Sequence, residues 1–334
     1  MEHRVSSQTN VFWLLENHRA NEMLDEDSLR RKIRRLDEAV WERRVPGHSL
    51  DDWLNSFSPS NHGIDERLQM LYLLSNFLYF GVREIRHLLR VLFGDLCRGP
   101  ILREIRVNNH DTIDLDLIDR SYAVALGRTR FLGVGNPSES GVHLLYYFRQ
   151  ENKLAPSLFI NQIQLPGVTV LEDHGPKHVD RYIFIDDLCA TGDQAIDYSQ
   201  WVVQTIKRAH SKALVAYFPL FATTSALKRV RREANFDRVA SVVELDDTFR
   251  CFADNSRFYS DVDAPISRDA ARETSLYYGS VLCPRHPLGY RESQLALGFS
   301  HNTPDNTLPI FWEEPNDLLP TWNPVFKRYS KLYS

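Results

Sequence analysis

Two adjacent acids, Asp186 and Asp187, stand where an apolar stretch of the chain gives way to a turn of small residues. The four residues before them, Tyr182 to Ile185, fit a buried strand. Gly192 permits a tight backbone turn, and the residues from Asp193 to Ala209 have the amphipathic pattern of a helix. The acids are therefore expected at the end of a strand, just before the first turn of a helix.

This arrangement suits a sugar phosphate. Unpaired backbone N–H groups and the positive end of the helix dipole favour an anion at a helix N-terminus, so phosphate binding is predicted for Thr191, Gly192, Asp193 and Gln194. Carboxylates before such a turn hydrogen-bond ribose hydroxyls or hold a divalent metal through their oxygens. The alternative for the acid pair is structural, because two solvated acids can also cap the next helix.

The order of strand, two acids and Thr-Gly turn resembles the signature of the type I phosphoribosyltransferases. In that family the signature binds the ribose 5-phosphate of phosphoribosyl pyrophosphate. The resemblance implies that Asp186 and Asp187 are catalytic, stabilising positive charge at the anomeric carbon. It also implies a magnesium cofactor, which the two acids hold directly or through ribose hydroxyls.

The chain departs from that signature in two places. Ala190 stands where many members carry a third acid used in acid/base chemistry, and Asp193 with Gln194 stands where the pattern usually ends in Thr or Ser. The Gln194 amide can still donate to a phosphate, whereas an Asp193 carboxylate aimed at a phosphate would repel it. These departures keep open a second hypothesis, a protein that binds a nucleotide without turning it over.

Composition indicates a globular protein without a strong electrostatic bias. The 334 residues are 43% hydrophobic, enough for one large or two moderate domains, and the net charge of -4 argues against a dominant nucleic-acid surface. The four cysteines form no Cys-x-x-Cys pair, so we expect neither a zinc site nor disulfides, and a cytoplasmic location. No apolar run approaches the roughly 20 residues of a membrane span, so no membrane partner is expected.

The chain changes character near residue 120. Before it, helical periodicity dominates: residues 29–40 have one apolar face, and the apolar residues from Leu68 to Ile85 predict a longer helix buried on more than one side. Residues 1–120 are therefore predicted to be a helical domain or cap.

From residue 121 onward, strands and helices alternate, as in a parallel sheet wrapped by crossover helices. The candidate strands are Phe131–Val134, Leu158–Ile160, Tyr182–Ile185, Ala213–Phe218 and Val239–Leu245. The predicted fold class is α/β, a phosphoribosyltransferase-like parallel sheet flanked by helices, in which residues 121–334 form the domain and end in a hood-like segment. Ligands of such sheets bind at the carboxyl ends of the strands, where the two acids are expected.

A second polar loop precedes the acid pair, between a predicted strand and a predicted helix. The loop at this position in phosphoribosyltransferases contacts the pyrophosphate, so the resemblance implies binding by Ser138, Glu139, Ser140 and Gly141. Glu139 is a poor anion ligand but can hold magnesium between the protein and the phosphates. The alternative is an ordinary helix start with Ser140 as its N-cap.

Two further polar runs, residues 286–290 and 301–306, lie near the C-terminus; we call residues 286–306 the hood segment. Its Tyr-x-x-Ser-Gln and His-Asn-Thr-Pro-x-Asn patterns resemble the phosphoribosyltransferase-like family of bacterial conflict systems, over about residues 130 to 315. Members of that family are thought to act in antiphage defence, some as retron-linked effectors. The resemblance implies acceptor contacts by His301, Asn302 and Asn306. The alternative is a Pro-centred turn whose Asn side chains bond the local backbone.

The functional hypothesis is an antiphage effector that binds phosphoribosyl pyrophosphate, or a related nucleotide, with magnesium and transfers ribosyl phosphate to an acceptor. The resemblance implies a regulatory protein or ribonucleoprotein partner, such as a retron reverse transcriptase with its nucleic acid, and toxicity when uncontrolled. The alternatives are a non-catalytic nucleotide sensor and a structural or nucleic-acid-associated subunit. Basic runs at residues 30–35 and 228–232 are interpreted as solvated helix faces, because acids lie nearby.

Overall fold

The computed structural model describes residues 24–59, 64–134, 140–160, 178–260 and 262–329. Its central feature is a parallel sheet of five strands in the order β2-β3-β4-β5, with β6 pairing the C-terminal end of β4. The strands are β2 (Thr129–Gly133), β3 (Arg181–Cys189), β4 (Leu214–Thr223), β5 (Arg238–Val239) and β6 (Val243–Leu245). All of these pairings are parallel, as alternating strands and helices predict.

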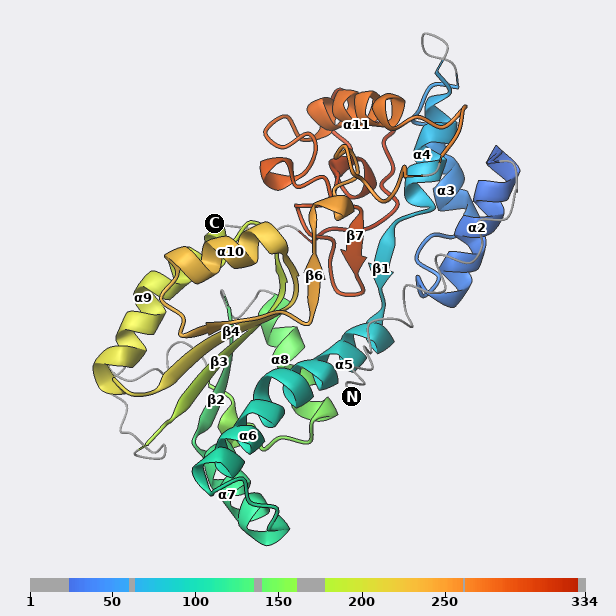
Figure 1. Cartoon of the computed structure of the whole chain (residues 1–334). Helices are drawn as coiled ribbons and strands as arrows, with labels where there is room; N and C mark the ends of the chain where they lie inside the picture. Colours follow the sequence, from blue (N-terminus) through green and yellow to red (C-terminus); the bar gives the residue numbers. More distant parts are fainter. Residues whose placement is uncertain (1–23, 60–63, 135–139, 161–177, 261, 330–334) are drawn as a thin grey trace.

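Helices cover both faces of this sheet (Figure 1). On one face lie α9 (Asp193–Ala209) and α10 (Thr224–Glu233), and against the other lie α5 (Val82–Val91) and α8 (Ser140–Glu151). Two apolar clusters result: Phe184 packs with residues of α9 and α10, whereas Ile183 packs with residues of α5 and α8. The predicted α/β class with a parallel sheet flanked by helices is confirmed. The bounds of α9 coincide with the predicted helix.

The N-terminal region is helical, as predicted. α2 (Glu26–Ala39) begins after Asp25, whose carboxylate accepts a hydrogen bond from the Ser28 backbone N–H at 2.8 Å. α3 (Gly47–Leu54) and α4 (Glu66–Leu74) follow, the latter capped in the same way by Asp65. These side-chain caps satisfy N–H groups that a helix leaves unpaired at its start.

Three local predictions were wrong. The long helix predicted across Leu68–Ile85 is broken into α4, the strand β1 (Leu78–Phe80) and α5. Its apolar residues reflect burial on all sides, which has no period and so does not distinguish helix from strand. Leu158–Ile160 forms only an isolated bridge from Phe159 to Phe131, and Val239–Leu245 is divided between β5 and β6.

The remaining elements lie outside the five-stranded sheet. A π-helical stretch (Leu92–Arg98) continues α5 into α6 (Gly99–Asn108), and α7 (Leu115–Gly127) leads to β2. After the sheet come α11 (Arg268–Leu282) and the short strand β7 (Leu297–Phe299), which pairs in parallel with β1. No described helix has both the length and the apolar composition needed to span a bilayer.

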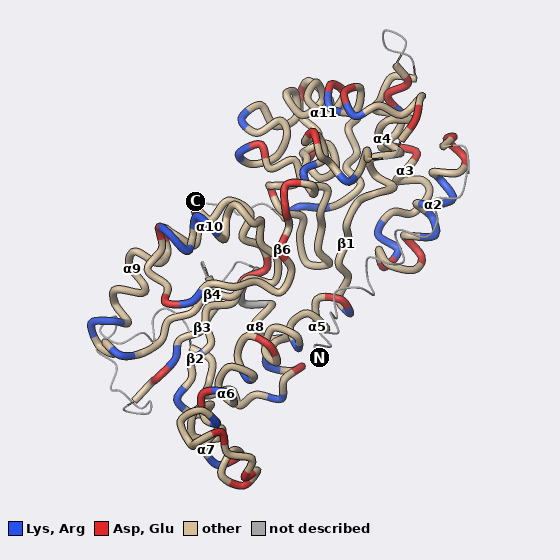
Figure 2. The backbone as a smooth tube through the Cα atoms, in the orientation of Figure 1, with Lys and Arg blue, Asp and Glu red and all other residues tan. Residues whose placement is uncertain are grey.

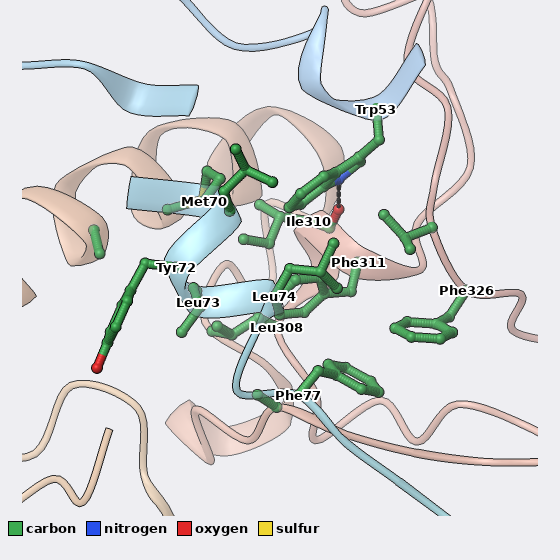
Figure 3. Close-up of a cluster of buried hydrophobic side chains, with 14 of the residues drawn as sticks. Trp53, Met70, Tyr72, Leu73, Leu74, Phe77, Leu308, Ile310, Phe311 and Phe326 are labelled. Carbon is green, nitrogen blue, oxygen red and sulfur yellow. Dashed lines mark hydrogen bonds between the residues drawn. The ribbon is translucent and has the colours of Figure 1, made fainter. Parts of the chain in front are cut away.

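A third apolar cluster joins the N-terminal helices to the C-terminal part of the chain (Figure 3). The Trp53 indole N–H donates to the Ile310 carbonyl at 2.8 Å, and its ring stacks on Phe311 at 5.7 Å. Phe77, just before β1, stacks on Phe326 with ring centroids 4.2 Å apart. These contacts join the N-terminal helices to residues 310–326, which follow the hood segment in the sequence.

The division of the chain at residue 120 remains a prediction. The packing nevertheless crosses that point, because the cluster around Trp53 contains buried residues both from 29–79 and from 251–326. A helical cap made of residues 1–120 alone would expose the apolar surface that these helices share with the C-terminal region.

We expect Trp53→Phe to lower the free energy of unfolding by about 2–4 kcal/mol, because it leaves the buried Ile310 carbonyl without its donor and removes buried volume. Urea denaturation measures this change. Trp201→Phe is the matched control, since Trp201 is 51% exposed, and its expected effect is within about 0.5 kcal/mol. Equal effects of the two changes would show that this hydrogen-bonded core does not fix the C-terminal region.

Candidate active site

Asp186 lies near the carboxyl end of β3 and is buried, with 7% of its surface exposed. The Tyr217 hydroxyl, from the neighbouring strand β4, donates to its Oδ2 at 2.8 Å. The backbone N–H of Asp187 donates to its Oδ1 at 3.0 Å. Burial, together with the Asp186 charge, raises the pKa of Tyr217 well above its ordinary value, so the phenol remains a hydrogen-bond donor. Asp186 thus holds the strand end in place.

Asp187 faces the hood segment. Its Oδ2 lies 3.0 Å from Nε2 of His301, and its Oδ1 accepts a hydrogen bond from the Leu188 backbone N–H at 2.8 Å. The His301 ring stacks almost parallel on Phe299, at 5.4 Å and 10°. Each side chain of the Asp187–His301 pair is 17% exposed. The pair therefore joins the carboxyl end of β3 to the hood segment, and both side chains remain partly accessible to solvent.

The two acids interrupt the regular alternation of β3. Ile183 and Ile185 pack in the cluster on the α5 and α8 face, but Cys189, also odd-numbered, packs in the cluster with α9 and α10. A strictly alternating strand would keep all three on one face. The change occurs across Asp186 and Asp187, so each acid meets partners from a different element.

The turn after the acids is tightly fixed. Gly192 has φ of 84°, in the left-handed region, and a Cβ there would lie 2.8 Å from the Val230 side chain. Only glycine meets both demands without strain. The Thr223 hydroxyl donates to the Ala190 carbonyl at 2.8 Å, and Arg229 donates to the Thr191 carbonyl at 3.1 Å. The turn is thus anchored to the end of β4 and to α10, with its glycine at the start of α9.

Asp193, the first residue of α9, is the centre of an ion-pair network. Nη1 of Arg229 on α10 donates to its Oδ1 at 2.5 Å, and Nε of Arg291 in the hood segment lies 2.9 Å from its Oδ2. The Thr191 hydroxyl donates to Oδ2 at 3.0 Å, and the Tyr290 hydroxyl lies 3.5 Å from the same oxygen. One carboxylate therefore ties the turn, α10 and the hood segment together.

The ion-pair network keeps Asp193 charged. Partial burial opposes its ionisation, but the hydrogen bonds from Arg229 and Thr191 and the charge of Arg291 outweigh that cost, so the pKa of the Asp193 carboxyl lies below its ordinary value. The repulsion that the sequence suggested between Asp193 and a phosphate is offset by the two guanidinium groups.

The other predicted site residues differ in placement. Gln194 is exposed in the first turn of α9. Ser138 and Glu139 lie outside the described residues; α8 begins at Ser140, and the side chains of Ser140 and Gly141 are also outside the description.

Within the hood segment, His301 reaches the acid pair, whereas the two asparagines bond to other parts of the C-terminal region. Oδ1 of Asn302 accepts the Tyr329 backbone N–H at 2.9 Å, and Nδ2 of buried Asn306 donates to the Ser293 hydroxyl at 3.0 Å. Asn302 also accepts the Thr303 backbone N–H at 3.0 Å, which is the local contact that the turn alternative describes, whereas Asn306 bonds the side chain of a distant residue. Acceptor contacts by Asn302 and Asn306 stay a prediction.

Sequence reasoning missed Tyr217, Arg229 and Arg291. Arg229 belongs to the basic run that was interpreted as a solvated helix face, and most of that run does fit the interpretation. Arg231 lies 4.0 Å from Glu244, and Arg232 pairs with Glu233. Acidic and basic residues are likewise interspersed along α2 (Figure 2). Arg229 differs by its contacts with Asp193 and with the Thr191 carbonyl, which no local pattern reveals.

The acid pair does not form a two-carboxylate chelate. Both oxygens of Asp186 accept hydrogen bonds, and Asp187 faces a different element. Among the described residues, no group of three or more His, Cys, Asp or Glu is arranged to hold a metal ion. Magnesium usually keeps water and ligand phosphates in its shell, so an ion held mainly by ligand oxygens fits these residues better than a protein cage.

Cys189 lies between the acids and the turn, but it is not activated. Burial, with a smaller contribution from the Asp186 charge, raises the pKa of the Cys189 thiol to about 12. The thiolate is the nucleophilic form of cysteine, so this residue has little reactivity at neutral pH. The chemistry of the site therefore depends on its carboxylates, backbone N–H groups and guanidinium groups.

We expect Asp193→Asn to destabilise the protein in a pH-dependent way. Because the folded-state pKa of Asp193 is lowered, its ionised form contributes stability that is present above about pH 4 and lost as the pH falls through the folded-state value. The difference in unfolding free energy between wild type and variant should therefore be largest near neutral pH and shrink in acid. Denaturant titrations at a series of pH values measure it.

The control for this experiment is Asp197→Asn, an exposed acid on the same helix. If the Asp193→Asn difference stays constant from neutral pH into acid, the ion pairs of Asp193 do not stabilise the fold.

Comparison with solved structures finds phosphoribosyltransferases. The orotate phosphoribosyltransferase from Aeropyrum pernix is 17% identical over 38% of this chain and 72% of that chain, with a TM-score of 0.24. The xanthine-guanine-hypoxanthine phosphoribosyltransferase of Helicobacter pylori is 10% identical over 46% of this chain and 90% of that chain, with a TM-score of 0.23. These scores describe partial overlap only. No curated protein matches the chain.

The family comparison covers much more of the sequence. The model of the PRTase-CE family matches residues 50–328. This range includes β1, the whole parallel sheet with its acid pair and turn, and the hood segment. The chain belongs to the PRTase-CE family.

Proposed function

We propose that the protein binds phosphoribosyl pyrophosphate and transfers its ribosyl phosphate group to an acceptor. The observation that carries this proposal is that Asp187 and the Gly192 turn lie together at the carboxyl end of β3, in contact with the hood segment. A carboxylate suited to ribose hydroxyls and a helix start suited to phosphate are thus only a few residues apart on a fixed backbone. Membership of the PRTase-CE family supports the same ligand class.

The two acids have different roles in this proposal. Asp187, which solvent reaches, contacts the ribose hydroxyls and is oriented by His301. Asp186 is buried and acts through the backbone, because it accepts the N–H of Asp187 and is itself held by Tyr217. The 5-phosphate occupies the turn from Thr191 to Gln194, at the start of α9, where the positive end of the helix dipole favours an anion.

Transfer breaks the bond between the anomeric carbon and a pyrophosphate oxygen, and the electron pair leaves with pyrophosphate. A nitrogen nucleophile of the acceptor forms the new bond to the same carbon and releases a proton. Positive charge develops on the ribose as the bond breaks, and the carboxylate of Asp187 stabilises it. Carboxylates fixed in advance by hydrogen bonds, as this one is, need no rearrangement to do so.

Magnesium is part of the proposal as a cofactor that arrives with the ligand. Asp187 is the described residue best placed to hold it, through the ribose hydroxyls, while Asp186 already has partners for both oxygens. When bound, the ion supplies positive charge that stabilises the leaving pyrophosphate. The loop with Ser138, Glu139, Ser140 and Gly141 is proposed to contact that pyrophosphate, on the resemblance alone.

The biological role we propose is that of an antiphage effector, possessing a toxic activity under the control of a protein or ribonucleoprotein such as a retron reverse transcriptase with its nucleic acid. The patterns in the hood segment support this role by resemblance. We also propose a cytoplasmic location. None of the four cysteines forms a disulfide in the described residues, as expected in a reducing compartment.

A nucleotide sensor is the second candidate. Two observations favour it: Ala190 stands where a third acid is common, and the Asp193 network ties the turn to the hood segment. Ligand binding at such a turn could be transmitted to the N-terminal helices through the shared core. A nucleic-acid-associated subunit is less favoured, because several arginines of the basic run on α10 pair with neighbouring acids.

We expect Asp187→Asn to abolish release of pyrophosphate, with at least about a 100-fold loss, and to leave the unfolding midpoint near that of wild type. Asp186→Asn should instead lower stability by about 1–3 kcal/mol, since it weakens buried hydrogen bonds. Asp197→Asn is the exposed control. Calorimetry with phosphoribosyl pyrophosphate and magnesium measures binding, a pyrophosphate assay across candidate nitrogen acceptors measures release, and urea denaturation measures stability.

Absence of binding by the wild-type protein would overturn the proposed function. Tight binding without pyrophosphate release from any acceptor would select the sensor. Equal loss of activity and equal loss of stability in the two variants would remove the division of roles between Asp186 and Asp187.

A further inference from the structure

Arg291 is held in a fixed part of the hood segment. Gly289 has φ of 88°, and a Cβ there would lie 2.4 Å from the Asn306 carbonyl oxygen. The Tyr290 backbone N–H donates to the Asp305 carbonyl at 2.7 Å. Arg291 itself has φ of 51°, in the left-handed region that side chains other than glycine rarely adopt. The backbone conformation that presents Arg291 is therefore imposed by its surroundings.

Most of the hydrogen-bonding capacity of Arg291 is unused by the described part of the protein. Its Nε pairs with Asp193 at 2.9 Å, yet its side chain is 54% exposed. Neither Nη group has a hydrogen-bond partner among the described residues. A guanidinium presents five N–H donors in a planar fork that matches phosphate oxygens. Asp193 thus anchors Arg291 by one donor and leaves the fork available beside the start of α9.

The charges around this point favour an anion. The ion pairs connect two carboxylates, Asp193 and Glu233, with three guanidinium groups, Arg229, Arg232 and Arg291, which gives the group a net charge of one positive. Asp193 is the first residue of α9, so the positive end of the helix dipole lies at the same point. Neither the helix start nor Asp193 alone would provide this positive charge.

We infer that Arg291 is a specificity-determining residue that recognises the 5-phosphate of a ribose phosphate. Asp193 is the positioning residue that orients Arg291. This inference rests on the proposed function. It extends the phosphate site from the turn to the hood segment, so that the segment binds ligand as well as covering it. A ligand that lacks the 5-phosphate gains no affinity from Arg291.

The test is calorimetric binding of two probes in the presence of magnesium: phosphoribosyl pyrophosphate, and pyrophosphate alone, which lacks the sugar phosphate. Arg291→Ala should weaken phosphoribosyl pyrophosphate by about tenfold or more, as expected for hydrogen bonds to a charged group. It should leave pyrophosphate affinity within about twofold of wild type. Arg291→Lys retains the charge but not the planar set of donors, so its affinity for phosphoribosyl pyrophosphate should lie between those of wild type and Arg291→Ala.

The matched control is Arg285→Ala, an exposed arginine just before the hood segment, which should change neither affinity. The positioning role of Asp193 is tested by combining Asp193→Asn with Arg291→Ala. If Asp193 aims Arg291, the effect of removing Arg291 shrinks in the Asp193→Asn background. Thermal unfolding of each variant identifies any loss of affinity that merely follows loss of fold.

The outcomes separate the two levels of the argument. If wild type fails to bind phosphoribosyl pyrophosphate, the proposed function is wrong and the role of Arg291 falls with it. If wild type binds but Arg291→Ala, still folded, binds equally well, only the role of Arg291 is wrong. Equal weakening of both probes would reduce Arg291 to a general electrostatic contribution and overturn its specificity, and an undiminished effect in the Asp193→Asn background would overturn the positioning role.

Discussion

A single carboxylate, that of Asp193, determines how the candidate site is assembled. It lies at the first position of α9 and pairs with arginines from α10 and from the hood segment. The Gly192 turn that precedes it admits no side chain, because Val230 fills the space where a Cβ would lie. Packing against Val230 thus fixes the backbone of the turn, and the Asp193–Arg291 ion pair fixes the hood segment to the turn. The remaining features of the site follow from this constraint.

The site joins parts of the chain that are far apart in sequence. Strand β7 of the hood segment pairs with β1, and the core around Trp53 contains residues from both ends of the protein. Asp187 meets His301, and Asp193 meets Arg291, so the same segment contacts the motif at two points. The N-terminal helices thereby support the hood segment that contacts the acids. The match of the family model to residues 50–328 covers both the sheet and this supporting core.

Local sequence patterns were sufficient for some of these features. The bounds of α9 and the parallel sheet follow from periodicity and from the alternation of elements. Strand β1 was hidden, because residues buried on all sides carry no period. An Asp193 carboxylate aimed at a phosphate is expected to repel it, and the sequence around Asp193 does not reveal the arginines from α10 and the hood segment that pair with it. Tyr217 was likewise invisible as the partner of Asp186. Pairings between distant residues arise only when the chain folds, so a single sequence does not reveal them.

The most direct measurement is a crystal structure of the protein with phosphoribosyl pyrophosphate and magnesium. We expect the 5-phosphate at about 2.7–3.2 Å from backbone N–H groups of the turn after Gly192, with Arg291 on the same phosphate and Asp187 on the ribose. A ligand bound elsewhere, with the turn still closed by Asp193 and with Asp187 paired only to His301, would contradict this expectation.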